Sequence, residues 1–264
     1  MGKGKGGAGC TTSALELAYA ATRRTRGDRQ RRVGVIDLDP QGNATAVLEP
    51  DSRTPGIKDV LAPRSEGQPP PLALRDALKP TAWENVWVAP ADRFLANREA
   101  DMTAEGIAAL RSARISGEID DLVDDVVVDL PRDIGRLSAA GLLGAEWLFI
   151  TARSTIWGAQ GAEEMRYTAT RIARKGNPEL KIAGYIVAAH ENTADAERVL
   201  GNLRETFGLD LLAPPVPRRA RVPEAIESYH TPCREFGAGL KGISDIYQKF
   251  YDLVLEKSLK SGDV

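Results

Sequence analysis

The start of the chain carries a glycine-rich stretch of a kind that can hold phosphate. Residues 4–12 read GKGGAGCTT and match the pattern G-x-x-x-x-G-K-[ST], except that Cys10 stands where the lysine belongs. Glycines let backbone N–H groups turn inward around phosphate oxygens, and the N-terminus of a following helix adds a partial positive charge. Thr11 stands where a hydroxyl would ligate Mg²⁺. Taken alone, the stretch fits a flexible N-terminal tail equally well.

Two further motifs place carboxylates at the ends of apolar runs. Residues 35–45 read VIDLDPQGNAT, and residues 126–131 read VVVDLP. At the ends of such strands, Asp39 would orient an attacking water, Asp37 would support the coordination shell of a metal ion, and Asp129 would hold Mg²⁺ through water. Separately, an Asp-Pro turn and an ordinary strand end explain these residues. The order and spacing of the three motifs together favour a nucleotide-binding site.

Cys10 is the main departure from a phosphate-binding loop. The lysine it replaces normally neutralises the terminal phosphates and stabilises charge in the transition state. A thiol is mostly neutral near pH 7, and a thiolate would repel phosphate. We therefore expect nucleotide binding to persist and hydrolysis to be impaired. Engineered replacement, natural degeneracy and compensation by Lys3 or Lys5 remain open explanations.

The elements that must position these residues alternate along the chain. Short apolar, β-branched runs predict strands, and longer amphipathic stretches predict helices. The predicted strands are Val33–Asp37, Val86–Ala89, Val126–Asp129, Trp147–Thr151, Ile182–Ala188 and Leu211–Val216. The predicted helices are Thr12–Arg26, Ala91–Arg114, Ile134–Leu143, Ile156–Lys175, Ala194–Thr206 and Gly237–Leu259.

This alternation predicts an α/β fold with a doubly wound, mostly parallel sheet and helices on both faces, of the P-loop NTPase type. A phosphate loop normally follows a central strand, yet only Met1–Gly4 precede this one. The first strand is therefore missing or truncated, or the sheet is incomplete. Residues 50–72 are rich in Pro, Gly and Ser and predict a surface excursion, so we expect residues 1–264 to form a single domain.

Composition narrows the functional classes. The 264 residues are 42% hydrophobic and 27% charged, with a net charge of −2, so any nucleic-acid contact must come from a local basic patch. Two cysteines and two histidines at scattered positions argue against a structural zinc site and favour a reduced, cytoplasmic protein. The N-terminus lacks the apolar segment of a signal peptide.

Residues 5–12 (KGGAGCTT) and 37–45 (DLDPQGNAT) closely resemble the ParA/Soj partition ATPases, which are related to MinD. The resemblance extends to GIKDVL at 56–61, NVWVAP at 85–90 and VPEA at 222–225, and so spans roughly the whole chain. It implies a homodimer that binds ATP and Mg²⁺, contacts double-stranded DNA without sequence preference and is stimulated by a ParB-like centromere-binding partner. It also implies a cytoplasmic, nucleoid-associated protein.

The resemblance implies roles for individual residues. Lys5 matches the signature lysine that reaches across the dimer, and Asp39 the acid that positions the hydrolytic water. Thr11, Asp37 and Asp129 are the implied metal-site residues. The implied nucleotide-binding residues are Gly6, Gly7, Ala8, Gly9, Cys10, Thr11 and Thr12, together with Pro217 in the loop Pro215–Arg218 that holds adenine in this family.

DNA binding in this family uses the C-terminal region, which makes Arg218, Arg219 and Arg221 the DNA-binding candidates. The arginine-rich run Arg23–Arg32 is better explained as a solvated helix end, with Gly27 as its cap.

Two alternative functions stay open. Cys10 favours a hydrolysis-deficient, nucleotide-gated binding module. A MinD-like membrane-surface ATPase would end in a basic amphipathic helix, but the apolar residues of the last predicted helix have core-like spacing, so we expect no membrane contact.

Overall fold

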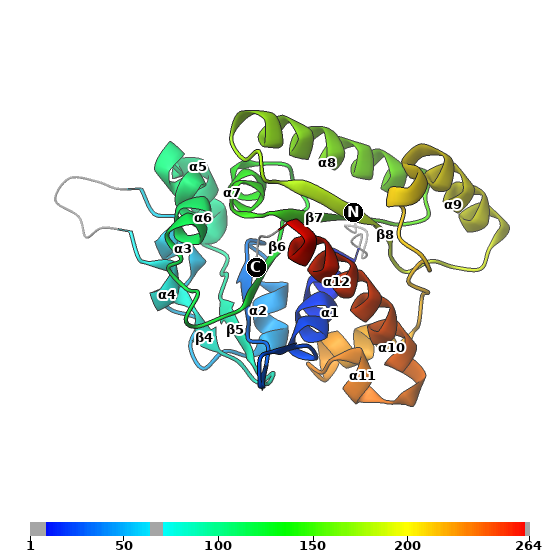
Figure 1. Cartoon of the computed structure of the whole chain (residues 1–264), viewed down its shortest axis with the longest axis horizontal. Helices are drawn as coiled ribbons and strands as arrows, with labels where there is room; N and C mark the ends of the chain where they lie inside the picture. The colour runs from blue at the N-terminus through cyan, green and yellow to red at the C-terminus, as the bar shows by residue number, and fades with distance from the viewer. Residues whose placement is uncertain (1–8, 64–70, 262–264) are drawn as a thin grey trace.

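The computed structural model describes residues 9–63 and 71–261, and its centre is a parallel sheet (Figure 1). Strand β3 (Val33–Asp37) lies between β5 (Val86–Ala89) and β6 (Asp125–Asp129) and is parallel to both. The short β4 (Lys79–Pro80) pairs antiparallel with the outer edge of β5. All five residues of β3 are buried, as expected for a parallel strand that is covered on both faces.

A second parallel pair continues the fold. Strand β7 (Trp147–Ala152) pairs with β8 (Lys181–Val187), but within the described residues it has no ladder with β6. The described sheet is therefore divided into β4-β5-β3-β6 and β7-β8.

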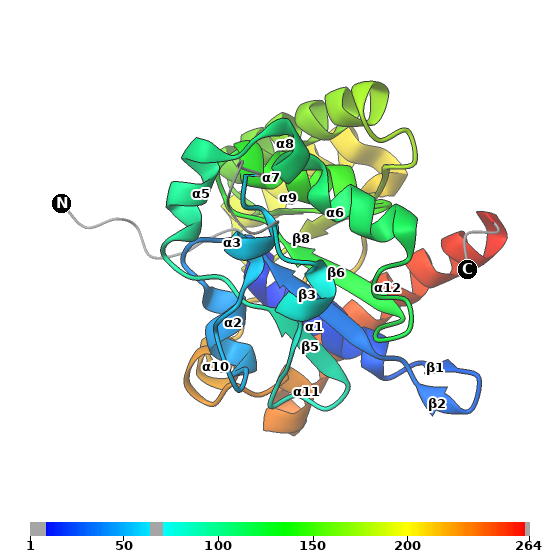
Figure 2. The ribbon, with the colours of Figure 1, turned by 90° about the vertical axis from the view of Figure 1, so that its left-hand side faces the viewer.

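Helices cover both faces of the strands (Figure 2). Helices α1 (Cys10–Thr22) and α12 (Lys241–Ser261) pack together on one face, and α6 (Ala104–Ser116), α7 (Arg136–Gly144) and α8 (Ile156–Lys175) lie on the other. The remaining α-helices are α2 (Asn43–Leu48), α3 (Ile57–Val60), α4 (Leu74–Ala77), α5 (Leu95–Asp101), α9 (Ala194–Phe207), α10 (Arg221–Pro223) and α11 (Cys233–Phe236). A π-helical segment (Glu224–Ser228) and two 3₁₀ turns (Gly208–Asp210 and Ala238–Leu240) complete the regular structure of the described residues. The predicted α/β fold, with mostly parallel strands and helices on both faces, is confirmed.

Two predicted elements are wrong. Leu211–Val216 is not a strand, because Pro214 and Pro215 have no N–H to donate. Its contact with β8 is limited to an isolated bridge at Leu211 and the single hydrogen bonds that Leu212 and Val216 donate to Tyr185 and Val187. The predicted helix Ala91–Arg114 is two helices, α5 and α6. The second begins afresh because the hydroxyl of Thr103 caps it by accepting from the N–H of Gly106 at 3.2 Å.

The arginine-rich run also differs from its prediction. Helix α1 ends at Thr22, and Gly27 lies in the turn of a small hairpin formed by β1 (Thr25–Arg26) and β2 (Arg29–Gln30). Ion pairs to Asp124, Asp125 and Asp252 hold most of its arginines. Because carboxylates of the same chain hold these arginines, we interpret the run as part of the fold rather than as a DNA-binding surface.

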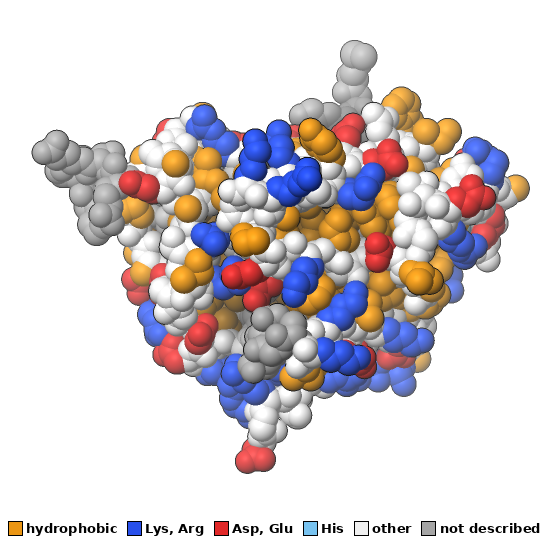
Figure 3. Space-filling view, turned by 45° about the horizontal axis from the view of Figure 1, so that its top comes forward, with side chains coloured by type: hydrophobic (Ala, Val, Ile, Leu, Met, Phe, Trp, Pro, Cys, Tyr) orange, Lys and Arg blue, Asp and Glu red, His pale blue; other side chains and the backbone are white. Residues whose placement is uncertain are grey.

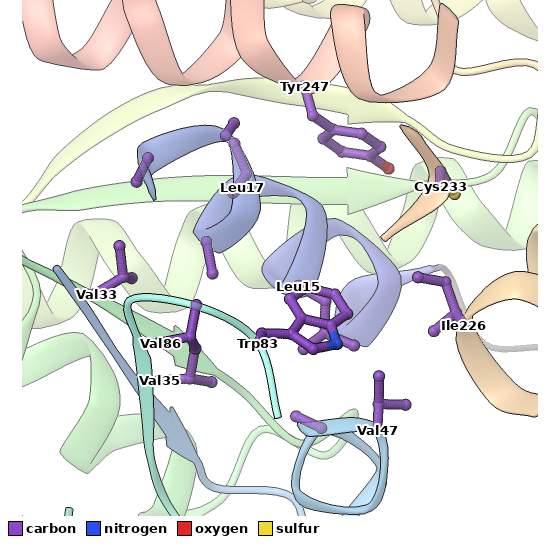
Figure 4. Packing of buried hydrophobic residues seen from close by; sticks show 14 of the residues in the cluster. Leu15, Leu17, Val33, Val35, Val47, Trp83, Val86, Ile226, Cys233 and Tyr247 are labelled. Carbon is purple, nitrogen blue, oxygen red and sulfur yellow. The ribbon is translucent and has the colours of Figure 1, made fainter. Parts of the chain in front are cut away.

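The helix that follows the glycine-rich loop, α1, is anchored to the C-terminal region by buried polar contacts. Figure 4 shows Tyr247 and Cys233 of this region beside α1 in the buried core. The hydroxyls of Ser13 and Tyr247 are 2.8 Å apart. The carboxylate of Glu16 accepts hydrogen bonds from the N–H of Cys233 at 2.8 Å and from the Ser244 hydroxyl at 2.6 Å. These contacts satisfy an otherwise costly buried carboxylate and fix α12 on α1. The apolar side of α12 is therefore used in the core, as the sequence spacing predicted.

Candidate nucleotide-binding site

The end of the glycine-rich loop lies at the carboxyl edge of the sheet. Gly9 precedes α1 with φ of 82°, a left-handed conformation that glycine adopts without a steric penalty. A Cβ built on Gly9 would stand 3.0 Å from the Cβ of Ala188, just beyond the end of β8. Glycine is therefore required here by both conformation and space. The backbone can then enter α1 with its free N–H groups at the helix N-terminus.

Cys10 points into the protein. Its Sγ lies 2.8 Å from the hydroxyl of Thr151 at the end of β7. Burial raises the pKa of the Cys10 thiol, and the hydrogen bond from Thr151 only partly opposes this effect. The thiol is therefore neutral near pH 7 and supplies no positive charge to a phosphate.

Two carboxylates from adjacent strands form the acidic centre of the site. Asp37 and Asp129 are register partners at the ends of β3 and β6, and both are buried. Asp37 accepts hydrogen bonds from the N–H of Thr45 at 2.8 Å and from its hydroxyl at 2.7 Å. Burial raises the pKa of Asp37 to about 6, although the Thr45 bonds favour the ionised form.

The ionised carboxylate of Asp129 has less support from hydrogen bonds than that of Asp37. Neither of its carboxylate oxygens has a hydrogen-bond partner of normal geometry among the described residues. Burial, followed by the negative charge of Asp37, raises the pKa of Asp129 to about 8, and the nearby Thr11 hydroxyl only lowers it in part. A buried carboxylate without partners is the environment that a cation or a metal-bound water would complete.

Asp39 lies in the turn that follows β3. Its carboxylate accepts from the N–H of Gln41 at 2.9 Å, and its carbonyl accepts from Gly42, which has φ of 64°. The side chain is half-buried, and its charge contributes to the raised pKa values of both Asp37 and Asp129. Asp39 therefore borders the acidic centre but remains open to solvent, as a residue that contacts water must be.

A cavity of about 500 Å³ opens next to this edge. Its lining residues are His190, Glu191, Asn192, Pro217, Arg218, Arg219 and Ala220. The ring of His190 is held between the Ser154 hydroxyl at 3.0 Å and the Glu197 carboxylate at 2.9 Å. The backbone of His190 bonds to Val216 and Arg218, so it also fixes the loop that carries Pro217. Pro217 thus lines a pocket of ligand size.

The structure brings together Thr11, Asp37 and Asp129, with Asp39 at the margin and Gly9, Cys10 and Thr12 at the start of α1. Lys5, Gly6, Gly7 and Ala8 lie outside the described residues. Sequence reasoning missed Thr45 and Thr151, which hold Asp37 and Cys10, and assigned no role to His190. Thr45 lies within the motif at 35–45, but nothing in the sequence pairs Thr151 or His190 with the loop.

The described residues of the site could hold Mg²⁺ only together with a bound nucleotide. Among the described residues, no group of three or more His, Cys, Asp or Glu side chains is arranged to hold a metal ion. The Thr11 hydroxyl and the partnerless Asp129 carboxylate supply oxygen donors, which Mg²⁺ prefers. Phosphate oxygens and water would have to complete the coordination.

The three DNA-binding candidates lie beside the cavity. Arg218 forms an ion pair with Glu191, and Arg221 pairs with Glu224 at 3.2 Å and lies over the Phe236 ring. Arg219 hydrogen bonds to the carbonyl of Arg218. All three arginines are exposed, but carboxylates hold two of them. Figure 3 shows one face of the molecule, on which several basic side chains gather near the top centre and acidic ones lie among the others.

Comparison with known proteins identifies the class. Residues 1–182 match the family model described as an AAA domain. The chain is 27% identical to the chromosome-partitioning ATPase Soj of Treponema pallidum over 87% of this chain and 88% of the relative. The chain thus belongs to the AAA domain family, and within it to the ParA/Soj type of partition ATPase. The resemblance expected from the sequence is confirmed.

Solved structures agree with this assignment. Cobyrinic acid a,c-diamide synthase from Mycobacterium smegmatis, solved with an ATP analogue and magnesium, superposes with a TM-score of 0.74 at 27% identity and covers 99% of this chain and 94% of its own. Apo McdA of Cyanothece superposes with a TM-score of 0.79 at 19% identity over 94% of this chain and 95% of its own. The latter likeness shows the fold alone. No helix among the described residues is both long and apolar enough to cross a bilayer.

Proposed function

We propose that the chain binds ATP and Mg²⁺ as a partition-type ATPase whose nucleotide closes a homodimer. The observation that carries the proposal is the meeting of Thr11, Asp37 and Asp129 at the N-terminus of α1. The helix N-terminus and the glycine-rich loop would hold phosphates, and the cavity beside Pro217 would hold the adenine. The similar structure of cobyrinic acid a,c-diamide synthase, solved with an ATP analogue and magnesium, supports this choice of nucleotide and metal.

Each residue then has a defined task. Thr11 and the ionised Asp129 would hold Mg²⁺, directly and through water, and the metal would neutralise charge on the phosphates. Asp37, fixed by Thr45, would keep Asp129 and its water in place. Asp39 would orient the attacking water, and Lys5 would reach the nucleotide of the partner subunit. With a neutral thiol at Cys10, catalysis lacks one charge contact that is worth about 10²–10³ in rate.

The likeness to partition ATPases supports a wider function as part of this proposal. The closed dimer binds double-stranded DNA without sequence preference through Arg218, Arg219 and Arg221, and a ParB-like protein triggers hydrolysis and release. The protein would then act in DNA segregation as a single domain in the cytoplasm, associated with the nucleoid. The ion pairs of Arg218 and Arg221 must open for phosphates to replace their carboxylate partners.

A second function is a nucleotide-gated binding module that does not hydrolyse ATP. The buried, neutral thiol of Cys10 favours it. Binding and turnover of ATP measured side by side, with and without DNA, separate the two. Binding with DNA-stimulated turnover supports the ATPase, binding without turnover supports the module, and the absence of binding contradicts both.

A further inference from the structure

The start of α1 lacks the positive charge that the phosphate-loop pattern places there. The pattern G-x-x-x-x-G-K-[ST] has a lysine at this position, whereas this chain has Cys10, whose Sγ contacts the Thr151 hydroxyl at 2.8 Å. The nearby carboxylates of Asp37 and Asp129 are buried, and each adds negative charge when it is ionised. Terminal phosphates at the start of α1 would therefore be held more firmly by a further cation in addition to Mg²⁺.

Two independent features point to a charged ligand at this place. The N–H of Ser13 donates to the carbonyl of Gly9 at 2.9 Å, so the N–H groups that precede it in α1 have no helical partner. Beside them, the carboxylate of Asp129 is buried, and neither of its oxygens has a hydrogen-bond partner of normal geometry among the described residues. Unpaired donors and an unpaired buried acceptor are together the environment that a metal-bound phosphate would complete.

Arg132 lies in the loop that leaves the same edge of the sheet. It follows Asp129 by three residues, so the Cα atoms of the two lie within about 11 Å of each other. The loop is fixed on both sides of Arg132. The carbonyl of Asp129 accepts from the N–H of Leu38 at 2.9 Å, and the carbonyl of Asp133 accepts from the Ser138 hydroxyl at 2.7 Å. The backbone thus holds Arg132 beside the site, and its side chain is exposed.

The positive charge of Arg132 acts on the Cys10 thiol. Burial raises the pKa of this thiol, and the influences that oppose burial include the hydrogen bond with Thr151 and the charge of Arg132. Charge interactions in a protein weaken with distance, so the Arg132 guanidinium must lie close to Cys10. A guanidinium therefore stands near the residue that replaces the lysine.

The fold does not use the guanidinium of Arg132. Within residues 9–63 and 71–261, its side chain forms neither an ion pair nor a hydrogen bond. Arg136, four residues further on, provides the contrast, because its guanidinium donates to the carbonyls of Met102 at 3.0 Å and Ala100 at 3.3 Å. The five N–H donors of a guanidinium form a planar fork that can bind two phosphate oxygens at once. Arg132 keeps this fork available at the edge of the site.

We propose that Arg132 binds the terminal phosphates of the nucleotide and supplies, from the loop after β6, part of the positive charge that Cys10 cannot supply. The inference rests on the proposed function and adds to it a phosphate-binding residue outside the glycine-rich loop. A guanidinium stays charged up to about pH 12, so the contact persists at the pH values where Asp129 is ionised and can hold Mg²⁺.

Calorimetric titration of the whole chain with ATP and excess Mg²⁺ at pH 9 tests the contact. Arg132→Gln should weaken ATP binding about tenfold or more, because it removes charged hydrogen bonds to phosphate. Its unfolding temperature without ATP should equal that of the parent, since the side chain is exposed and unused by the fold. Arg132→Lys should retain part of the affinity, because it keeps the charge but not the fork. The matched control Arg136→Gln should change the affinity by less than about twofold.

The same titrations in the Cys10→Lys background place the contact at the terminal phosphates. There the loss caused by Arg132→Gln should be smaller, because the new lysine supplies charge to the same phosphates. A loss of equal size in both backgrounds would overturn the inference, and so would equal weakening by Arg132→Gln and Arg136→Gln. Parental ATP affinity in Arg132→Gln would overturn the inference alone, whereas a parent chain that binds no ATP would overturn the proposed function as well.

Discussion

At the residue scale, Cys10 determines how much catalysis the site can support. Replacing Cys10 by Lys would place an ammonium near the terminal phosphates, where the neutral thiol now contacts Thr151. We expect Cys10→Lys to raise ATP turnover by about tenfold or more, since one preorganised charge contact is worth about 10²–10³ in rate. Steady-state phosphate release measures it.

The double variant Cys10→Lys/Asp39→Ala is the matched control. It should lose the gain, because the attacking water would have no group to orient it. If Cys10→Lys binds ATP tightly but stays inert with DNA and the partner protein present, hydrolysis is not the function, and the gated binding module is the better explanation.

The titration of Asp129 gives a second prediction at this scale. Its pKa is raised to about 8 by burial and by Asp37. The folded chain keeps Asp129 protonated more readily than the unfolded chain does. This difference stabilises the fold fully below the normal carboxyl range, and the stabilisation is lost as the pH rises through about 8. Asp129→Asn cannot ionise, so in metal-free solution the variant should be more stable than the parent at pH 9, by an amount on the order of a few kcal/mol.

Thermal unfolding at pH 6 and pH 9 without magnesium measures this difference. The advantage of Asp129→Asn should grow between the two pH values, and magnesium with ATP should stabilise only the parent. The same pH dependence in both proteins would show that Asp129 is not the buried group that titrates.

At the scale of single elements, the start of α1 depends on Gly9. An alanine there would adopt φ of 82° with its Cβ 3.0 Å from Ala188. We expect Gly9→Ala to cost about 1 kcal/mol or more in stability and to weaken ATP binding, because the helix N-terminus must shift. Denaturant unfolding and ATP titration check the two effects.

Gly27 provides the matched control. It also has a left-handed φ, of 61°, but nothing lies within 4 Å of its Cβ position. Gly27→Ala should show the conformational cost alone and leave ATP binding unchanged. Equal loss of ATP binding in both variants would indicate a general effect of destabilisation.

How far the elements could be predicted from the sequence depends on their residues. Buried strands such as Val33–Asp37 are continuous apolar runs, and their terminal acids were correctly expected at one edge. The segment Leu211–Val216 is equally apolar, but its prolines prevent a ladder. The contacts of Cys10 with Thr151 and of His190 with Glu197 join elements that are distant in sequence, so no local pattern predicts them.

At the scale of the whole molecule, the three arginines beside the cavity give a prediction about DNA. Charge reversal at Arg218, Arg219 and Arg221 should weaken binding to all duplex sequences alike and reduce its salt dependence, because lost phosphate contacts release fewer counterions. Binding titrations at several salt concentrations measure this. Retardation that depends on sequence, or that is insensitive to salt, would contradict phosphate-backbone contacts.

The whole arrangement of loop, helix and paired acids is proposed to bind ATP with Mg²⁺. Isothermal titration calorimetry at pH 9, where Asp129 is mostly ionised, tests this most directly. We predict weak, magnesium-dependent binding of ATP to the folded chain and its loss in Asp129→Ala. A folded chain that gives no binding heat and no thermal stabilisation at millimolar ATP would contradict the proposal.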